Sequence, residues 1–361
     1  MQKCIISDTM KIPFGSFTFI PKTFLGVDIG TSSIKAVELY RWGERRSLKN
    51  YGELEIPSMY KKPFRTFEKN ALLLERTDIA KALKAVLEEA HIEAKQAVFS
   101  IPDFSSFFTN FELPPMSKKE LGDAVAFEAR RHIPVPLSEV VFDWQLIEGR
   151  YEQNTPLSIL MVAVPNEVVR QYQEIAKEAG LQLVALEAEV FGLIRSCIWE
   201  DERPIVLLDI GAQSTAVNAV FKGSLRISHS FDIAGNALTE RIAKSLSIDY
   251  ESAQREKAQK GMTGEYASIL SPLVDMILGE VEKIADAFQQ SKGRTIEKII
   301  LGGGSAKLPG LKEYVQQNMR KEVEIADPFR SIYYPPILEG TMKATGPSYA
   351  VSVGMALRGL E

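Results

Sequence analysis

The stretch FLGVDIGTSSIKAVEL at residues 24–39 decides the fold, because IVLLDIGAQSTAVNAV at residues 205–220 repeats its pattern. Each stretch reads as an apolar strand, the tripeptide Asp-Ile-Gly, a turn of small residues and a second strand. The two stretches lie about half the chain apart. We therefore expect a duplicated α/β fold, whose two halves open with the same hairpin and enclose a cleft. The corresponding positions are Asp28 with Asp209, Gly30 with Gly211, and Ser33 with Ser214.

Composition sets the broad class of the chain. It has 361 residues, of which 45% are hydrophobic and 25% charged, and these values are ordinary for a globular protein of about two domains. The formal net charge of −4 disfavours a nucleic-acid partner, since such proteins usually carry a basic field. Two distant cysteines, Cys4 and Cys197, exclude a disulfide scaffold and a cysteine-based zinc site. No apolar run is long enough for a transmembrane helix, so we expect a cytoplasmic chain that reaches a membrane peripherally or through a partner.

Outside the two hairpins, the apolar periodicity predicts alternating strands and helices. Residues 95–164 differ from the rest, because they are rich in strands and aromatics and hold one helix. That helix begins with the capping-box pattern of Ser117 and Glu120. Further helices are predicted at residues 308–319 and, closing the chain, at residues 348–357.

The residue types of the two turns suit a polyphosphate ligand. Glycine allows a sharp turn, and the successive N–H groups of such a turn converge on phosphate oxygens. Hydroxyl side chains add donors, and Lys35 adds a positive charge. The strand-end aspartates, Asp28 and Asp209, suit Mg²⁺ held through its waters, since this ion gives up water reluctantly. Either turn alone reads as an ordinary hairpin, so the prediction of a phosphate clamp depends on the pair.

A third element, LGGGSAKLPGL at residues 301–311, reads as a strand, a glycine run and a helix. A glycine run lets a base or sugar approach the backbone closely near a helix N-terminus. Lys307 stands where a Rossmann fingerprint has glycine, and the chain holds no Gly-Lys dipeptide for a P-loop. The run is therefore either a nucleotide-contacting loop of another kind or a plain connector.

In this order and spacing, the three elements resemble the actin-like ATPase superfamily, whose fold is ribonuclease H-like and duplicated. The resemblance extends over about residues 23–360. The stretches VDIGTSSIKAVEL, LLDIGAQSTAVNAV, DIAGNALTERIAKSL and GPSYAVSVGMAL are similar to the PilM family of type IV pilus assembly proteins. That family is itself similar to the division protein FtsA, with which it shares an inserted subdomain called 1C. The resemblance thus implies two domains around a nucleotide cleft, with a 1C-type insert.

The resemblance also implies a division of the chain. The expected parts are an N-terminal tail at 1–21, a domain 1 core (1A) at 22–92, 165–199 and 340–361, the insert 1C at 93–164, a domain 2 core (2A) at 200–248 and 295–339, and a helical subdomain 2B at 249–294.

The same resemblance implies ATP and Mg²⁺ in the cleft and transfers three sets of residues, with no catalytic residue among them. The metal would be held, through water, by Asp28 and Asp209. The phosphates would be bound by Gly30, Thr31, Ser32, Ser33, Lys35, Gly211, Ala212, Gln213 and Ser214. The adenosine would be bound by Gln254, Lys257, Gly302, Gly303, Gly304, Ser305, Lys307 and Leu308.

Two positions depart from the pattern of active ATPases. Gln213 stands where the second phosphate loop of active relatives often has a second glycine, and we expect its side chain to crowd the γ-phosphate. Gln254 stands where a glutamate usually contacts the ribose, and an amide makes a weaker hydrogen bond than a carboxylate. We therefore expect nucleotide binding with weak or no ATP hydrolysis.

The family resemblance further implies a groove between the insert and the first domain. This groove would receive the cytoplasmic N-terminal peptide of a PilN-like inner-membrane protein, and so link the chain to the pilus motor ATPases. In the first strand of the insert, Phe107, Phe111 and Leu113 share one face and read as core. Phe104 and Phe108 are then surplus aromatics, which we expect in an exposed apolar patch that contributes to the groove. The sequence leaves homo-oligomerisation open.

Three other functions on the same fold stay open. An FtsA-like membrane tether of cell division would be expected to continue past the closing helix into an amphipathic helix. A GspL-like protein of type II secretion would continue into a transmembrane helix. A small-molecule kinase would need a catalytic carboxylate poised by the second domain, together with a substrate pocket.

Overall fold

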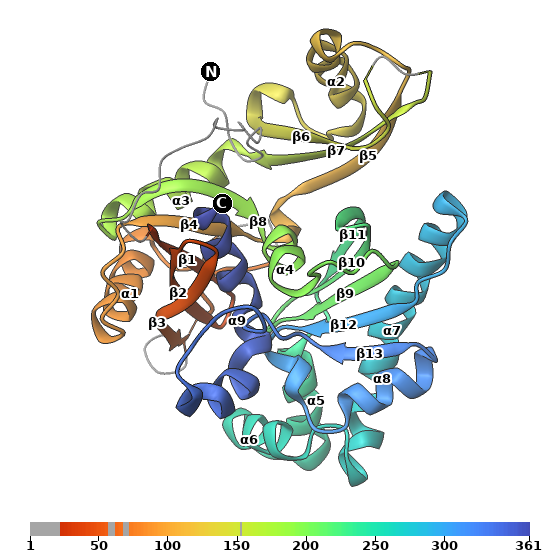
Figure 1. Cartoon of the computed structure of the whole chain (residues 1–361). Helices are drawn as coiled ribbons and strands as arrows, with labels where there is room; N and C mark the ends of the chain where they lie inside the picture. Colours follow the sequence, from red (N-terminus) through yellow and green to blue (C-terminus); the bar gives the residue numbers. More distant parts are fainter. Residues whose placement is uncertain (1–21, 57–61, 68–71, 152–153) are drawn as a thin grey trace.

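The computed structural model describes residues 22–56, 62–67, 72–151 and 154–361. The predicted N-terminal tail, residues 1–21, lies outside the described residues. Within them, the chain forms two five-stranded sheets and one three-stranded sheet, with helices packed between and around them (Figure 1).

The first large sheet has the strand order β3-β2-β1-β4-β8. Its first three strands form an antiparallel meander, as the sequence predicts, and its last two run parallel to β1. The central strand β1 is almost entirely buried, which explains its apolar run. The bounds are β1 Lys22–Ile29, β2 Ser33–Trp42, β3 Arg45–Glu55, β4 Gln96–Ile101 and β8 Gln182–Ala188.

The second large sheet repeats this arrangement, with the order β11-β10-β9-β12-β13. Strands β9 to β11 are an antiparallel meander, and β12 and β13 run parallel to β9. The predicted duplication is therefore confirmed, with β1 and β9 in equivalent central positions. The bounds are β9 Ile205–Ile210, β10 Thr215–Phe221, β11 Ser224–Phe231, β12 Lys298–Gly302 and β13 Glu322–Ile325.

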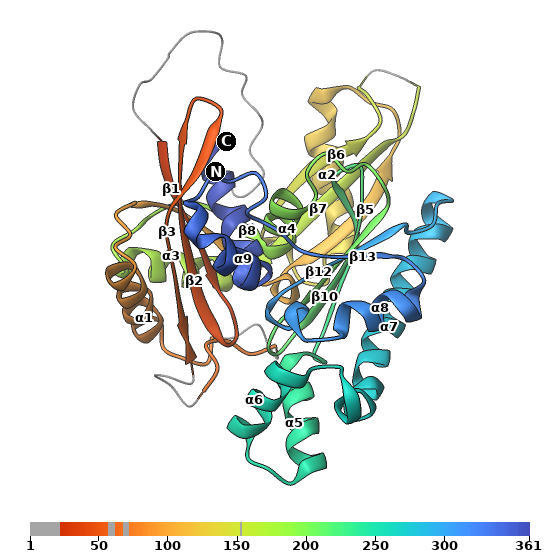
Figure 2. The same ribbon diagram turned by 60° about the horizontal axis from the view of Figure 1, so that its bottom comes forward.

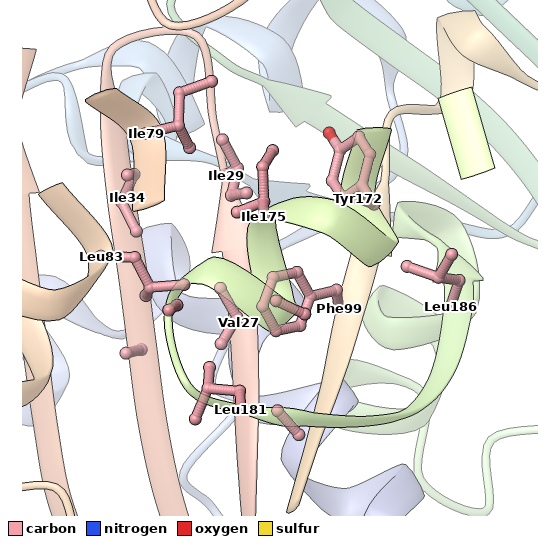
Figure 3. Packing of buried hydrophobic residues seen from close by; sticks show 14 of the residues in the cluster. Val27, Ile29, Ile34, Ile79, Leu83, Phe99, Tyr172, Ile175, Leu181 and Leu186 are labelled. Atoms are coloured by element: carbon pink, nitrogen blue, oxygen red, sulfur yellow. The ribbon is translucent and has the colours of Figure 1, made fainter. Parts of the chain in front are cut away.

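Helices cover both sheets. On the first sheet, α1 (Arg76–Glu89) and α3 (Asn166–Glu178) pack over one face, and their apolar residues interdigitate with those of β1 and β4 (Figure 3). In the second half, the long helix α7 (Gly264–Lys292) packs against β10. The remaining helices of this half are α5 Gly235–Leu246, α6 Tyr250–Lys260 and α8 Leu311–Met319.

The last helix, α9 (Glu339–Leu360), lies on the opposite face of the first sheet (Figure 2). It approaches β1 and α4 (Glu189–Cys197) so closely that only glycine fits at the contacts. A Cβ on Gly26 would lie 1.9 Å from the Ser352 carbonyl oxygen, and one on Gly354 would lie 2.0 Å from that of Gly192. The helix is longer than its predicted span of 348–357.

The sequence predicts that the helix begins after Pro347, but in the structure Pro347 lies inside α9 and is buried. Proline normally ends a helix, because it removes a backbone donor and clashes with the preceding turn. Here the tertiary packing of the helix against the first sheet outweighs that local preference. The other predicted helix, 308–319, begins later than expected, at Leu311, because Gly310 adopts a left-handed φ of +74° just before it.

The insert is a small subdomain of its own, with the sheet order β5-β7-β6 and helix α2 packed on one face (Figure 1). The predicted capping box is confirmed, since the Glu120 carboxylate accepts from both the N–H and the hydroxyl of Ser117. Strand β4, which the predicted division assigns to the insert, pairs with β1 and β8 in the first large sheet, and the division itself stays a prediction. The bounds are η3 Asp103–Ser105, β5 Phe107–Leu113, α2 Lys118–His132, η4 Leu137–Glu139, β6 Val140–Glu148 and β7 Leu157–Pro165.

The insert also touches the second half of the molecule. The Asn110 side-chain amide on β5 donates to the Arg226 carbonyl oxygen on β11. The Arg226 guanidinium in turn forms an ion pair of 3.3 Å with Glu148 on β6. The insert therefore bridges the two halves beside the cleft. Among the helices of the described ranges, none is long and apolar enough to cross a membrane.

Candidate functional site

A cavity of about 820 Å³ lies between the two halves, and the turns of both hairpins line it. Most of the residues singled out from the sequence meet in its wall. The exceptions are Gln213, Gly302 and Phe108. The predicted residues that line the cavity are Asp28, Gly30, Thr31, Ser32, Ser33, Lys35, Phe104, Asp209, Gly211, Ala212, Ser214, Gln254, Lys257, Gly303, Gly304, Ser305, Lys307 and Leu308.

The first turn joins β1 to β2, and its carbonyl groups accept hydrogen bonds from neighbouring segments. It closes with the Gly30 N–H donating to the Ser33 carbonyl oxygen over 2.8 Å. The Thr31 carbonyl accepts from the N–H of Phe64, and the Ser32 carbonyl from that of Ile56. The side chains of Thr31 and Ser33 are buried, while Ser32 is exposed toward the cavity that all three line. The turn is therefore a rigid ridge of hydroxyl groups.

The charges of the first hairpin are already paired. Asp28 and Lys35 face each other in the register of β1 and β2. The Asp28 carboxylate accepts from the Ser100 hydroxyl over 2.7 Å. The Lys35 ammonium donates to the Ser33 hydroxyl over 2.5 Å and lies 3.2 Å from the Glu53 carboxylate. Both charged groups are buried, so their partners fix them in place.

The second turn joins β9 to β10 and has the same closing bond, from the Gly211 N–H to the Ser214 carbonyl oxygen at 3.0 Å. It is held by the first turn of α5, whose N–H groups at Gly235 and Asn236 donate to the carbonyls of Gly211 and Ala212. An α-helix N-terminus adjoins the turn, and its dipole favours negative charge there.

Gln213 is the one predicted residue of the second turn that does not line the cavity, and the expectation that its side chain crowds the terminal phosphate stays a prediction. Its Oε1 atom is buried and has no hydrogen-bond partner among the described residues.

The glycine run after β12 closes over the second hairpin. Gly303 has a φ of +80°, and a Cβ there would lie 2.4 Å from the Ile210 carbonyl oxygen and 2.6 Å from Oδ1 of Asp209. Glycine is therefore required at this position for two separate reasons. The Gly303 N–H donates to the Pro347 carbonyl oxygen of α9, so this loop also contacts the first half of the molecule.

Helix α6 supplies the opposite wall. The buried Lys257 ammonium donates to the Gly235 carbonyl oxygen over 2.8 Å, and burial lowers its pKa to about 8. Gln254 is exposed and accepts from the Thr239 hydroxyl over 2.6 Å. Tyr250, which is 45% exposed, also lines the cavity and donates to the Asn236 side chain. This wall offers amide, ammonium and aromatic groups, the types that bind a sugar and a base.

The floor of the cavity is acidic. Asp28, Asp103, Glu189 and Asp209 all line it. Burial raises the pKa of Asp209 to about 7, and the charges of Glu189 and Asp28 add to this effect. Burial also raises the pKa of Asp103 and of Glu189, and a neighbouring charge adds to the effect in each case, that of Glu189 for Asp103 and that of Asp28 for Glu189. The floor thus carries more negative charge than its own cations balance.

These observations fit a divalent cation bound through water. A cation would supply the positive charge that the floor lacks, and Asp28 and Asp209 bring a carboxylate from each half. In the described part of the chain, no group of three or more His, Cys, Asp or Glu side chains forms a direct metal site. The two carboxylates of Asp28 and Asp209 suit a cation that keeps several of its waters, as Mg²⁺ does.

Sequence reasoning missed Arg65, Asp103 and Glu189. Arg65 is 5% exposed and forms an ion pair with Glu189 on the cavity floor. The Asp103 N–H donates to Glu189, and the Asp103 carboxylate accepts from the N–H of Val190. These residues are far apart in the chain and belong to no motif. The available signal was a charged residue inside an otherwise apolar run, as at Glu189 between Ala188 and Val190.

The two surplus aromatics of the insert do not form an exposed patch. Phe104 is partly buried on the cavity wall, where its ring lies 5.0 Å from that of Phe67. Phe108 is partly buried against the first-domain core, with its ring 6.3 Å from that of Phe191. The expectation of an exposed apolar patch is therefore wrong. Their contact with a partner peptide stays a prediction.

Comparison with known proteins supports the fold. Residues 26–360 match the family described as type IV pilus assembly protein PilM. Among solved structures, a PilM-PilN type IV pilus biogenesis complex superposes with a TM-score of 0.81 at 26% identity, covering 93% of this chain and 98% of that one. MreB5 of Spiroplasma citri bound to AMPPNP shares the fold, with a TM-score of 0.51 at 12% identity over 93% and 95% of the two chains. The predicted actin-like fold is thus confirmed.

Curated relatives are more distant in sequence. The cell division protein FtsA of Streptococcus pneumoniae is 20% identical over 353 residues, which cover 84% of this chain and 75% of that protein. FtsA of Bacillus subtilis is 22% identical over 244 residues, so the match spans about half the length of each chain, 56% of this one and 54% of that one.

Proposed function

The chain belongs to the PilM family of type IV pilus assembly proteins, and from this premise we propose that it is an ATP-binding scaffold that docks a PilN-like membrane protein. The observation that carries the nucleotide half of the proposal is the pair of equivalent turns facing one cavity from opposite halves of the molecule. A polyphosphate bound there would be held by backbone, hydroxyl and ammonium donors from both sides.

The rest of the ligand follows from the walls of the cavity. Lys257 and Gln254 on α6 would hold the adenosine, together with the loop after β12. These two residues and this loop line the cavity on the side where α5 begins. Mg²⁺ would lie between the phosphates and the two strand-end aspartates, Asp28 and Asp209, and would neutralise charge on both. The residues of the chain bind and orient the nucleotide, and the ion supplies the missing positive charge.

We further propose that ATP turnover is weak or absent. The amide of Gln254 supports this, because it binds a ribose hydroxyl less strongly than a carboxylate does. The Glu189 carboxylate supports it too, since its two oxygens accept from Arg65 and from the Asp103 N–H. A carboxylate engaged in this way is a poor base for an attacking water. A phosphate-release assay with turnover above about 1 s⁻¹, the low end of ordinary enzyme rates, would exclude a slow scaffold.

The partner half of the proposal rests on the similarity to a complex that contains PilN. We place the docking groove between the insert and the first domain, at the cytoplasmic face of the inner membrane, where the chain is held by its partner. The bridge from Asn110 and Glu148 of the insert to Arg226 of the second half gives the insert a fixed orientation beside the cleft. A pre-oriented groove lowers the entropic cost of binding a flexible peptide.

The test is a titration of the full chain with the cytosolic N-terminal peptide of a PilN-like protein, with and without Mg·ATP. Saturable binding that a scrambled peptide fails to reproduce is the expected result. A dependence on nucleotide would measure the coupling free energy between cleft and groove. If the peptide binds neither with nor without Mg·ATP, although circular dichroism shows that the protein is folded, the scaffold function is rejected in favour of a division-protein or kinase function.

A further inference from the structure

Arg65, which belongs to neither phosphate turn, lies at the acidic end of the cavity. Arg65 lies in the described segment 62–67, and its side chain is almost fully buried. The segment is fixed by Phe64, which is fully buried and whose N–H donates to the Thr31 carbonyl of the first phosphate turn. The position of Arg65 is therefore tied directly to that turn.

The guanidinium is held as a planar fork. One terminal nitrogen donates to the Glu189 carboxylate, and the other donates to the Tyr172 hydroxyl over 3.3 Å. The Phe104 ring, 5.4 Å away, covers one side of the group. Tyr172 is anchored in the core of α3, and Figure 3 shows its hydroxyl oxygen directed out of that apolar cluster. The Arg65 side chain thus has one fixed geometry.

The hydrogen-bonding capacity of this group is not used up. A guanidinium has five N–H donors, and the two contacts above use two of them. The Nε atom is buried without a partner among the described residues, and the side chain lines the cavity, so the remaining N–H groups of the terminal nitrogens are the donors available to a ligand oxygen. The group lines the same cavity as Asp28 and Asp209, the two carboxylates proposed for the metal.

The location distinguishes one part of a nucleotide from another. Arg65 lies with the strand-end aspartates and Glu189, whereas Lys257 and Gln254 belong to the α6 wall. A nucleotide with its base on the α6 side and its inner phosphates in the two turns would direct its last phosphate toward the acidic floor. That phosphate brings negative charge to a region already rich in carboxylates, so it needs a cation there in addition to Mg²⁺.

We propose that Arg65 forms a subsite for the terminal phosphate of a nucleoside triphosphate, and that it makes the cleft prefer ATP over ADP. The proposal rests on the nucleotide binding proposed above and names the residue that reads the length of the phosphate chain. A planar fork suits this task, because it recognises two oxygens of one phosphate at once.

The experiment compares binding of ATP and of ADP by calorimetry at a fixed free Mg²⁺ concentration. In Arg65→Met, the ATP dissociation constant is expected to rise about tenfold or more, and the ADP constant by less than about threefold, as one charged hydrogen bond predicts. Arg65→Lys keeps the charge but not the fork, so it should recover only part of the preference. The matched control is Arg170→Met, an exposed arginine on α3, which should change neither constant.

Removing Arg65 alone leaves Glu189 buried without its cation, which can unfold the protein. The double variant Arg65→Met with Glu189→Gln avoids the orphan charge, and Glu189→Gln alone shows what the glutamate contributes. Loss of the ATP preference in the double variant but not in Glu189→Gln supports the subsite. Equal weakening of ATP and ADP, or an unchanged preference, overturns it. If the wild-type chain binds neither nucleotide, the proposed function itself fails, and this subsite with it.

Discussion

The two hairpins have the same backbone arrangement but differ in the groups around the strand-end aspartate. Each turn closes with the same glycine-to-serine hydrogen bond, at 2.8 Å in the first and 3.0 Å in the second. The residue facing the strand-end aspartate is Lys35 in the first hairpin and Ala216 in the second. The first aspartate has a hydroxyl donor from Ser100, and the second has a pKa raised to about 7.

This difference assigns the two halves different tasks. The charged side chains of the first hairpin already have partners, the Ser100 hydroxyl for Asp28 and Glu53 for Lys35, so they are fixed before any ligand arrives. The second carries an uncompensated carboxylate, which gains most from an incoming cation. The two copies of the fold thus share the turn but differ in the side chains around it, and we expect the second copy to gain more from a bound cation.

The largest expected effect comes from breaking the second hairpin at the loop that covers it. Gly303→Ala adds a methyl group where two oxygens lie within 2.6 Å, at a φ that favours glycine. We expect the free energy of unfolding to fall by about 3 kcal/mol or more, measured by urea denaturation. Gly304→Ala is the matched control, because a Cβ there meets nothing within 4 Å. Equal effects of the two substitutions would contradict this explanation.

A smaller effect is expected from removing the cation that distinguishes the first hairpin. Lys35→Met takes away a charged donor to the phosphates, and the ATP dissociation constant should rise about tenfold to a hundredfold. Lys81→Met, on the exposed face of α1, serves as the control. Calorimetry at fixed Mg²⁺ measures both. If Lys35→Met binds ATP as tightly as the wild type, the first hairpin is not the fixed anion site.

The smallest expected effect concerns pH. Asp209 has a pKa raised from 3.8 to about 7 in the folded chain, so the folded state binds more protons than the unfolded state. Its contribution to stability is therefore fully present below about pH 4 and is lost as pH rises to about 7. Asp209→Asn should remove part of this slope, on the order of 1 kcal/mol in the free energy of unfolding. Thermal melts of the nucleotide-free protein from pH 4 to pH 8 measure it.

The same substitution in the first hairpin sharpens the comparison. Asp28→Asn should reduce the slope between pH 4 and pH 7 by less than Asp209→Asn does, because it removes only one of the neighbouring charges that raise the pKa of Asp209. An equal loss of slope in both variants would mean that the two hairpins are electrostatically alike.

The sequence was sufficient for the features that repeat or that have local chemistry. The duplicated hairpins, the capping box at Ser117 and the α/β order all follow from short patterns, and the structure confirms them. The assignment of the two turns to phosphate came from the same patterns, because glycine turns and hydroxyl groups suit phosphate oxygens, and it stays a prediction. Family membership followed from the same stretches.

What the sequence could not supply depends on distant contacts. Arg65, Asp103 and Glu189 meet on the cavity floor although they lie in three different elements. Phe104 was expected at the surface, but the fold turns it onto the cavity wall. Pro347 was expected to precede a helix, and packing against the first sheet carries the helix through it. For Phe104 and Pro347, tertiary contacts outweighed a local preference, whereas the three charged residues meet only because the fold brings them together.

The placement of α9 has a consequence for how the chain is made. This helix covers one face of the first sheet, yet its residues 339–360 are synthesised after the whole second half. During synthesis, the strands that begin at residue 22 have this face uncovered until α9 has been made, and until then Gly26 has no helix to pack against. The second half can complete its own core first, from residues 205–325. Chaperones that bind exposed apolar sheet would therefore meet the first half of this protein, and we expect the second half to fold first, the reverse of the usual N-terminal-first order.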